Sequence, residues 1–196
     1  MDDPYLETPV LKIVLKCLPW ILALMVLQVF STMILSGFEG KIASLTILSV
    51  FTPLIMDAGG NSGGQTTTMI VRSMSLDEFG KGDLKRVIWK ELRVALCIAA
   101  AIAIFTFGWI NLEMAVGVVK IDTTIETIAN NGISNPELWA RLGVAGLVSG
   151  TLFVTMIISR MVGCFLPFIA KAIKLDPAVM CGPFTTTVVD VISLLT

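Results

Sequence analysis

The chain has 196 residues, of which 55% are hydrophobic and only 15% are charged, and its mean hydropathy is +0.87. Soluble domains carry about 25% charged residues, so this composition suits a lipid environment better than water. The 14 basic and 15 acidic residues nearly cancel, and the Lys and Arg are too scattered to track the phosphates of a nucleic acid. Histidine is absent, which removes the commonest transition-metal ligand and general base.

Five apolar stretches are candidates for membrane spans, since a helix needs roughly 20 mostly apolar residues to cross a bilayer. In chain order they cover residues 10–35, 42–69, 92–110, 138–173 and 178–196. The fourth is long enough to tilt, to kink at Pro167 or to extend beyond the bilayer. We therefore predict an all-α integral membrane protein with five transmembrane helices per subunit.

Basic residues are concentrated between the second and third stretches: Arg72, Lys81, Lys85, Arg86, Lys90 and Arg93. Between the third and fourth stretches the only basic residue is Lys120. The positive-inside rule then predicts a multi-pass protein of the cell's inner (plasma) membrane, with its N-terminus cytoplasmic and its C-terminus outside. In this orientation, the segment from Asn130 to Pro136 is an external loop.

The cysteines do not form a metal or redox motif. All four lie in apolar stretches, and none belongs to a CxxC pair: Cys17, Cys97, Cys164 and Cys181. We expect buried thiols that pack as small hydrophobic side chains.

Among the charged residues of the apolar stretches, three stand out because they lie well inside a stretch: Asp57, Arg160 and Asp190. A charge in the hydrocarbon core costs about 2.5 to 3.5 kcal/mol on insertion scales, so such residues indicate function by default. If the second stretch is a helix, Asp57, Asn61 and Gln65 lie on one face, because they are four residues apart. The polar side chains of this stripe either line a cavity, or their amides only hold helices together by hydrogen bonds.

Glycines are interleaved with this polar stripe. Gly59 and Gly63, like Gly60 and Gly64, are four residues apart, a spacing that lets another backbone approach closely. The alternative is a helix that breaks at the glycines and exposes carbonyl groups to a cavity.

Asp190 belongs to a second polar stripe. On a helix it shares a face with Gly182, Thr186 and Ser193, and Pro183 can expose a carbonyl near that face. Carboxylate, hydroxyl and carbonyl oxygens suit Mg²⁺, which keeps most of its water and needs few direct ligands. The alternative is a carboxylate that is protonated, or paired for structure.

Arg160 lies toward the inner half of the fourth stretch. It can pair with Asp57 or Asp190, or extend toward the cytoplasmic surface. Pairing with Asp190 would oppose a cation there, so we expect a structural or gating role.

Two segments resemble the MgtE magnesium channel family. The run from Gly59 to Gln65, followed by Arg72, resembles the GGNxGxQ…R signature of that family's second membrane helix. The runs 166–168, 176–178 and 183–190 (LPF, DPA and PFTTTVVD) resemble its fourth and fifth helices. The resemblance covers most of the chain.

The resemblance implies a homodimer with the pore at its two-fold interface, lined by the second and fifth helices. The acid matching Asp190 would hold the transported, hydrated Mg²⁺, with Thr186 and Gly182 beside it. Other residues would line or shape the path: Asp57, Gly60, Asn61, Gly64, Gln65, Pro183 and Thr187. The expected partners are a second subunit, membrane lipid and a divalent cation, with no nucleic acid.

The chain departs from the family in three respects. No segment resembles the cytoplasmic regulatory domains, including a CBS pair, with which the family usually begins. We therefore expect residues 1–196 to form a single transmembrane ion-permeation domain, either truncated or ungated. Gly182 and Arg160 stand where Asn is common in the family, which leaves selectivity and conductance open.

Other functions fit parts of the pattern. Oxygen ligands also accept Mn²⁺ or Co²⁺, and coupled exchange with Na⁺ or H⁺ is an alternative. Asp57 and Asp190 could form the dyad of an intramembrane aspartyl hydrolase, but Asp190 lacks the GxGD context, so we expect no enzyme. A non-conducting scaffold, packed through Gly146 and Gly150, would not need a carboxylate at membrane depth.

Overall fold

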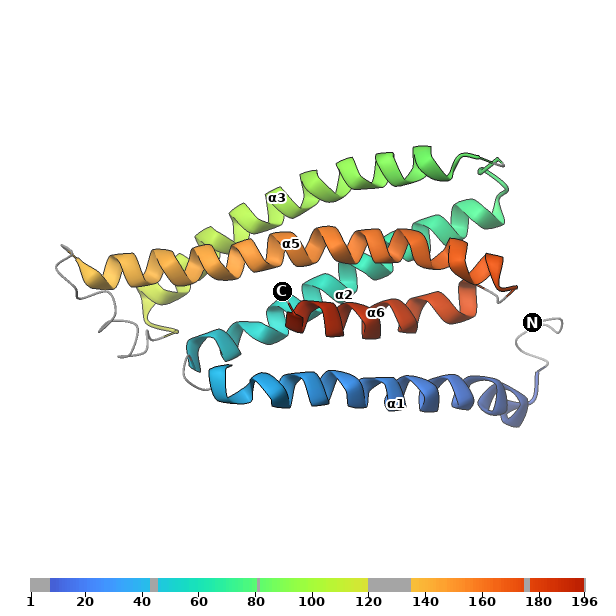
Figure 1. Ribbon diagram of the computed structural model, residues 1–196, viewed down its shortest axis with the longest axis horizontal. Coiled ribbons are helices and arrows are strands. Elements are labelled where there is room, and N and C mark those ends of the chain that lie inside the picture. Colours follow the sequence, from blue (N-terminus) through green and yellow to red (C-terminus); the bar gives the residue numbers. More distant parts are fainter. Residues whose placement is uncertain (1–7, 43–45, 81, 120–134, 175–176, 196) are drawn as a thin grey trace.

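The computed structural model describes residues 8–42, 46–80, 82–119, 135–174 and 177–195 (Figure 1). Throughout these ranges the ordered elements are helices, and no β-strand occurs. The helices are α1 (Val10–Ile42), α2 (Thr46–Ser75), α3 (Leu84–Val116), α5 (Pro136–Ala172) and α6 (Pro177–Leu195). Each overlaps one predicted apolar stretch, and α1, α2 and α3 extend beyond the predicted bounds. The all-α prediction is confirmed for this part of the chain.

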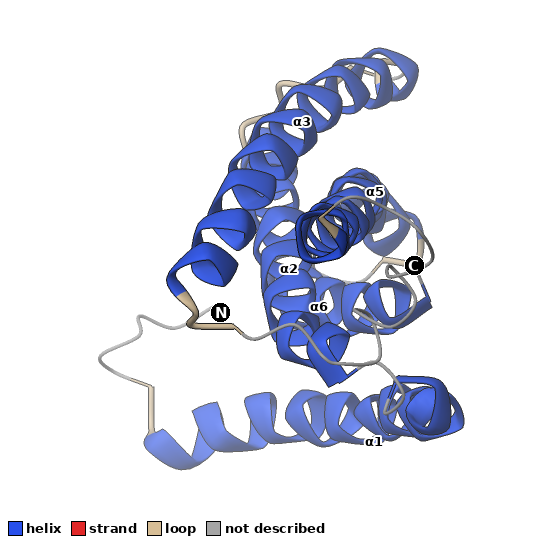
Figure 2. Ribbon diagram, turned by 90° about the vertical axis from the view of Figure 1, so that its left-hand side faces the viewer, coloured by secondary structure: helices blue, strands red, loops and turns tan. Residues whose placement is uncertain are grey.

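Helix α5 is the centre of the bundle. It packs against α2, α3 and α6, whereas α1 lies at the edge and packs mainly on α6 (Figure 2). The buried apolar clusters follow α5 along its length. Val148 packs with Ile110 of α3, Leu152 with Ala99 of α3, and Leu166 with Cys181 of α6. The hydrophobic core is therefore organised around this helix.

Much of the apolar surface faces outward. Leu84–Val116 and Glu137–Ala172 are long and apolar enough to cross a membrane, by length and composition. In the most apolar segment of α3 only 22% of the residues are buried. Ile104 is 74% exposed and Phe105 is 64% exposed. An outward apolar surface of this extent suits contact with lipid or with another protein.

Helices α3 and α5 have well-defined ends on the side away from the basic residues. Gly117 ends α3 in the left-handed conformation (φ 80°), with its N–H bonded to the Met114 carbonyl and the Val118 N–H bonded to the Glu113 carbonyl. This is a Schellman ending, and glycine permits it. Pro136 begins α5, where its missing N–H costs nothing. The predicted external loop around Asn130 lies outside the described residues.

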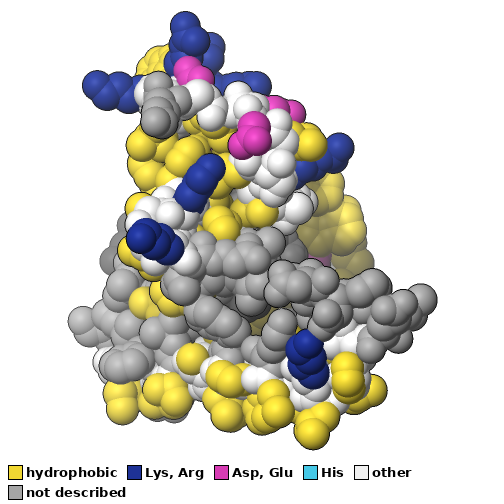
Figure 3. All heavy atoms as spheres, turned by 90° about the vertical axis from the view of Figure 1, so that its right-hand side faces the viewer, with side chains coloured by type: hydrophobic (Ala, Val, Ile, Leu, Met, Phe, Trp, Pro, Cys, Tyr) yellow, Lys and Arg dark blue, Asp and Glu magenta, His cyan; other side chains and the backbone are white. Residues whose placement is uncertain are grey.

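Most of the basic residues of the described helices and connections lie toward the opposite end of the bundle. The start of α1, the α2–α3 connection and the end of α5 lie together there (Figure 1). Arg72 is in the last turn of α2 and Lys171 in the last turn of α5. Figure 3 shows Lys and Arg side chains gathered on this end. The bundle therefore has a basic end, and its helices run alternately toward it and away from it.

Candidate functional site

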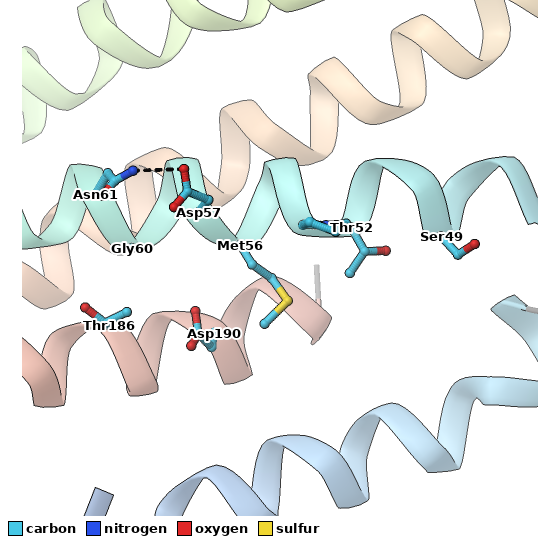
Figure 4. Close-up of a pocket in the computed structure, with 9 residues that line it drawn as sticks. Ser49, Thr52, Met56, Asp57, Gly60, Asn61, Thr186 and Asp190 are labelled. Atoms are coloured by element: carbon cyan, nitrogen blue, oxygen red, sulfur yellow. Dashed lines mark hydrogen bonds between the residues drawn. The ribbon is translucent and has the colours of Figure 1, made fainter. Parts of the chain in front are cut away.

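A cavity of about 630 Å³ lies between α2 and α6 and contains both aspartates identified from the sequence. Its lining residues are Ser49, Thr52, Pro53, Met56, Asp57, Gly60, Asn61, Thr186 and Asp190. Figure 4 shows Thr186 and Asp190 on α6 facing the side of α2 that carries Asp57 and Gly60. The fold thus brings together the two polar stripes that the sequence placed on separate helices.

One face of α2 supplies most of the lining. The positions 49, 52, 53, 56, 57 and 60 recur at intervals of three and four residues, the spacing of a single helical face. Helix α2 runs without interruption from Thr46 to Ser75, with Pro53 inside it. The broken-helix alternative is therefore wrong, and the glycines act within a continuous helix.

The glycines of α2 separate into two faces. A Cβ at Gly59 would lie 2.9 Å from Thr155 Cγ2 on α5, and one at Gly63 would lie 2.6 Å from Ser159 Oγ. These two glycines allow the close approach expected from their spacing. A Cβ at Gly60 would lie 3.2 Å from Thr186 Cγ2, on the side of the cavity. A Cβ at Gly64 would have nothing within 4 Å, so the structure gives no packing reason for this glycine.

Hydrogen bonds fix the rotation of α6. Thr185 is fully buried, and its hydroxyl is 2.6 Å from the Cys181 carbonyl oxygen and 3.0 Å from the Thr67 hydroxyl of α2. Val189, also fully buried, follows one turn later. Because Thr185 and Val189 face the core, the next residue on each turn, Thr186 and Asp190, lies at the cavity. The core side of α6 thereby positions the polar side.

Asp57 is held by its own helix. The Asn61 side-chain amide donates a hydrogen bond to Asp57 Oδ2 over 3.0 Å (Figure 4). The two residues are one turn apart, as the predicted stripe requires. This bond orients the Asp57 carboxylate at the wall of the cavity.

Several residues of the predicted stripes are not at the cavity. Gln65 is exposed, and Thr187 is buried at 7% exposure, but neither contributes to the lining. Ser193 is buried and donates to the Val189 carbonyl, so the predicted face of α6 ends at Asp190. Gly182 and Pro183 belong to α6, but their side-chain surroundings lie outside the described residues.

Arg160 pairs with neither aspartate of the cavity. Its guanidinium is bonded to the carboxylate of Glu91 on α3, and its side chain is 2% exposed. The predicted choice among Asp57, Asp190 and the cytoplasmic surface is therefore wrong. Sequence reasoning missed Glu91 because it lies at the edge of the apolar stretch, among basic residues.

Two other expectations need correction. Cys164 and Cys181 are buried as expected, but Cys17 and Cys97 are exposed. Gly146 and Gly150 were considered above as packing residues, but a Cβ at either position would have nothing within 4 Å. No helix of the described chain therefore packs closely on these two glycines.

Four residues at one end of the cavity were not predicted from the sequence: Ser49, Thr52, Pro53 and Met56. A signal for them exists, because they continue the Asp57 and Gly60 face backward at helical spacing. Hydroxyls and a proline inside an apolar helix attract less notice than a charge, although they fall on the same face.

The cavity offers oxygen ligands and space. Within the described residues no three His, Cys, Asp or Glu side chains gather as a metal centre. Asp57 and Asp190 instead combine with hydroxyl and amide groups at a wide cavity. A water molecule takes about 30 Å³, so the six waters of octahedral Mg²⁺ occupy roughly 180 Å³. The cavity therefore has room for a hydrated cation.

Comparison with known proteins points to a single family. The family described as "MgtE: Divalent cation transporter" matches residues 52–196. A magnesium transporter MgtE of Bacillus subtilis is 29% identical over 179 residues, which cover 91% of this chain and 34% of the relative. One of Thermus thermophilus is 27% identical over 194 residues, covering 99% of this chain and 37% of the relative. The chain thus spans about a third of the length of these relatives.

Proposed function

The chain belongs to the MgtE family of divalent cation transporters, and we propose that it passes Mg²⁺ across a membrane through the cavity between α2 and α6. The observation that carries the proposal is the joint presence of Asp57 and Asp190 at one cavity. Two carboxylates supply the charge that a hydrated divalent ion needs. They also attract it from water without removing its hydration shell.

In this proposal Asp190 is the principal ion-binding residue, with Thr186 beside it. Asp57, held by Asn61, adds negative charge on the opposite wall. Gly60 keeps the wall free of a side chain where α2 faces Thr186. Inside-negative membrane potential would drive influx by about 4.6 kcal/mol per 100 mV for two charges, so no ATP site is required.

We further propose that all five described helices cross the bilayer and that the basic end faces the cytoplasm. A homodimer would bring a second Asp190 to the pore if its two-fold axis runs along the cavity. The outward apolar faces of α1 and α3 would then meet lipid. Other divalent cations, such as Mn²⁺ and Co²⁺, are alternative substrates, because they accept the same oxygen ligands.

The test is Mg²⁺ influx into proteoliposomes containing the purified chain. Asp190→Asn and Asp190→Ala should each abolish most of the influx, while the protein keeps its fold and oligomeric state. Asp77→Asn is the matched control: Asp77 is exposed in the α2–α3 connection at φ 53°, a conformation that Asn also adopts. Undiminished influx in the Asp190 variants would move the site elsewhere. Passage of Mn²⁺ or Co²⁺ but not Mg²⁺ would overturn the magnesium assignment.

A further inference from the structure

Arg160 and Glu91 form a buried ion pair behind the helix that lines the cavity. Their side chains are 2% and 10% exposed. The same Glu91 oxygen, Oε1, accepts a hydrogen bond from Arg160 Nη2 and one from Thr66 Oγ1 of α2, the latter over 3.0 Å. Helices α2, α3 and α5 therefore meet at one carboxylate oxygen.

Stability alone is a weak reason for this arrangement. Removing two charges from water is costly, and a buried ion pair often contributes no more than apolar side chains of the same volume. The pair is also incompletely satisfied, because Arg160 Nε is buried without a hydrogen-bond partner. A pair that only fastened helices would be replaceable by apolar packing.

The pair is close to the proposed cation path. Ser159, which precedes Arg160 on α5, donates a hydrogen bond to the Gly59 carbonyl of α2. The next residue of α2, Gly60, lines the cavity. The guanidinium lies further along α2, beside the Glu91 oxygen to which Thr66 donates, and Thr66 is six residues from Gly60, about 9 Å along the helix axis. Because this pair is buried in protein, mobile ions screen its charges less than they screen exposed charges.

We propose that Glu91 is a positioning residue for cation passage, which cancels the charge of Arg160 and keeps the cavity attractive to multivalent cations. This inference rests on the proposed function of the cavity as a cation path. An arginine does not lose its proton in proteins, so Glu91→Gln leaves a full positive charge beside the path. Arg160→Gln does the opposite and leaves the Glu91 carboxylate without its counterion.

Charge dependence separates this role from simple packing. The interaction of an added charge with a bound ion grows in proportion to the charge of that ion. The probes are Mg²⁺ and hexaamminecobalt(III), a triply charged complex that resembles hydrated Mg²⁺ in size. Their binding is measured as the dissociation constant, the concentration of half-saturation, which is obtained by fitting the rise in Tm of the purified full chain against ion concentration. This measurement needs no ion flux.

In Glu91→Gln we expect this concentration to rise about tenfold for Mg²⁺ and about thirtyfold for hexaamminecobalt(III), since the logarithms of the shifts should stand in the ratio of the charges. Arg160→Gln should lower both concentrations. The double variant should return close to the unmodified chain. The matched control is Glu113→Gln, which removes a carboxylate from the other end of the same helix and should shift neither probe.

Equal shifts for the two probes would overturn the proposal, and so would weaker binding in Arg160→Gln or a double variant no better than Glu91→Gln. If Glu91→Gln does not fold, Arg160→Gln and the double variant still show whether the charge change strengthens or weakens ion binding. Failure of both ions to raise the Tm of the unmodified chain would also overturn it. Absence of Mg²⁺ influx together with normal charge-dependent binding would overturn the proposed function alone.

Discussion

Gly63 of α2 and Gly163 of α5 meet where neither helix has room for a side chain. A Cβ at position 163 would fall on the carbonyl oxygen of Gly63, and a Cβ at position 63 would lie 2.6 Å from Ser159 Oγ. This approach brings Thr67 Oγ1 within 3.1 Å of the Gly163 carbonyl oxygen. That oxygen needs a partner, because Pro167 has no N–H to complete the helical bond. The glycines, Thr67 and Pro167 are therefore parts of one contact.

Gly63→Ala should lower the free energy of unfolding by about 1 to 3 kcal/mol, because the new methyl group overpacks the α2–α5 crossing. Chemical denaturation of the purified protein in detergent measures the change. Gly64→Ala is the control, since a Cβ there would meet nothing within 4 Å. That change should be neutral or raise stability by about 0.5 to 1 kcal/mol, the ordinary gain in a helix interior. Equal losses in the two variants would contradict the close crossing.

Thr67→Val should destabilise the protein by about 1 to 3 kcal/mol, because it leaves the buried Gly163 carbonyl without its hydroxyl donor and removes a partner of Thr185. The change conserves volume, so packing contributes little to the effect. Thr68→Val is the matched control: the Thr68 hydroxyl is exposed and bonds to the Gly64 carbonyl of its own helix. A Thr67 effect no larger than the Thr68 effect would show that this bond between helices contributes nothing.

Local physical rules predicted much of the fold. The apolar stretches are helices, as expected of segments that must satisfy their own backbone hydrogen bonds in order to cross a bilayer. The spacing of Asp57 and Asn61 predicted a shared face, and the two side chains are hydrogen-bonded. The spacing of Gly59 and Gly63 predicted a close helix contact, and α5 provides it.

The remaining features of the fold and the site depend on how the helices rotate and pair. The spacing of residues along the sequence does not determine this. Gln65 continues the helical stripe of Asn61, but it lies beyond the end of the cavity. The partner of Arg160 came from a third helix, at a position with no special motif. The rotation of α6 depends on Thr185, whose bond to Thr67 joins residues far apart in the chain. Such contacts appear only when the helices are assembled.

The proposed orientation predicts which side of the membrane reaches each connection. In a chain whose four native cysteines are replaced by serine or alanine, Glu78→Cys should react with a membrane-impermeant maleimide only from the cytoplasmic side. Glu78 is exposed in the connection at the basic end. Val118→Cys, at the opposite end and 71% exposed in the present chain, should react only from outside. Labelling of intact cells and of inverted vesicles measures both, and reactivity of both sites from one side would contradict the orientation.

Asp57 and Asp190 should act on the same ion if the cavity is the cation path. Asp57→Asn removes one of the two carboxylates and keeps the hydrogen-bonding shape of the side chain, so the Mg²⁺ concentration for half-maximal influx should rise about tenfold.

A thermodynamic cycle tests whether the two carboxylates share an ion. It consists of Asp190→Asn, Asp57→Asn and the double variant, with Mg²⁺ binding measured by its effect on Tm. Two groups around one ion are expected to couple by about 0.5 to 3 kcal/mol, whereas independent sites add within about 0.5 kcal/mol. Coupling would support one shared hydrated ion between α2 and α6, because each carboxylate then loses part of its effect when the other is absent. Additive losses would instead assign the two aspartates to separate ions along the path.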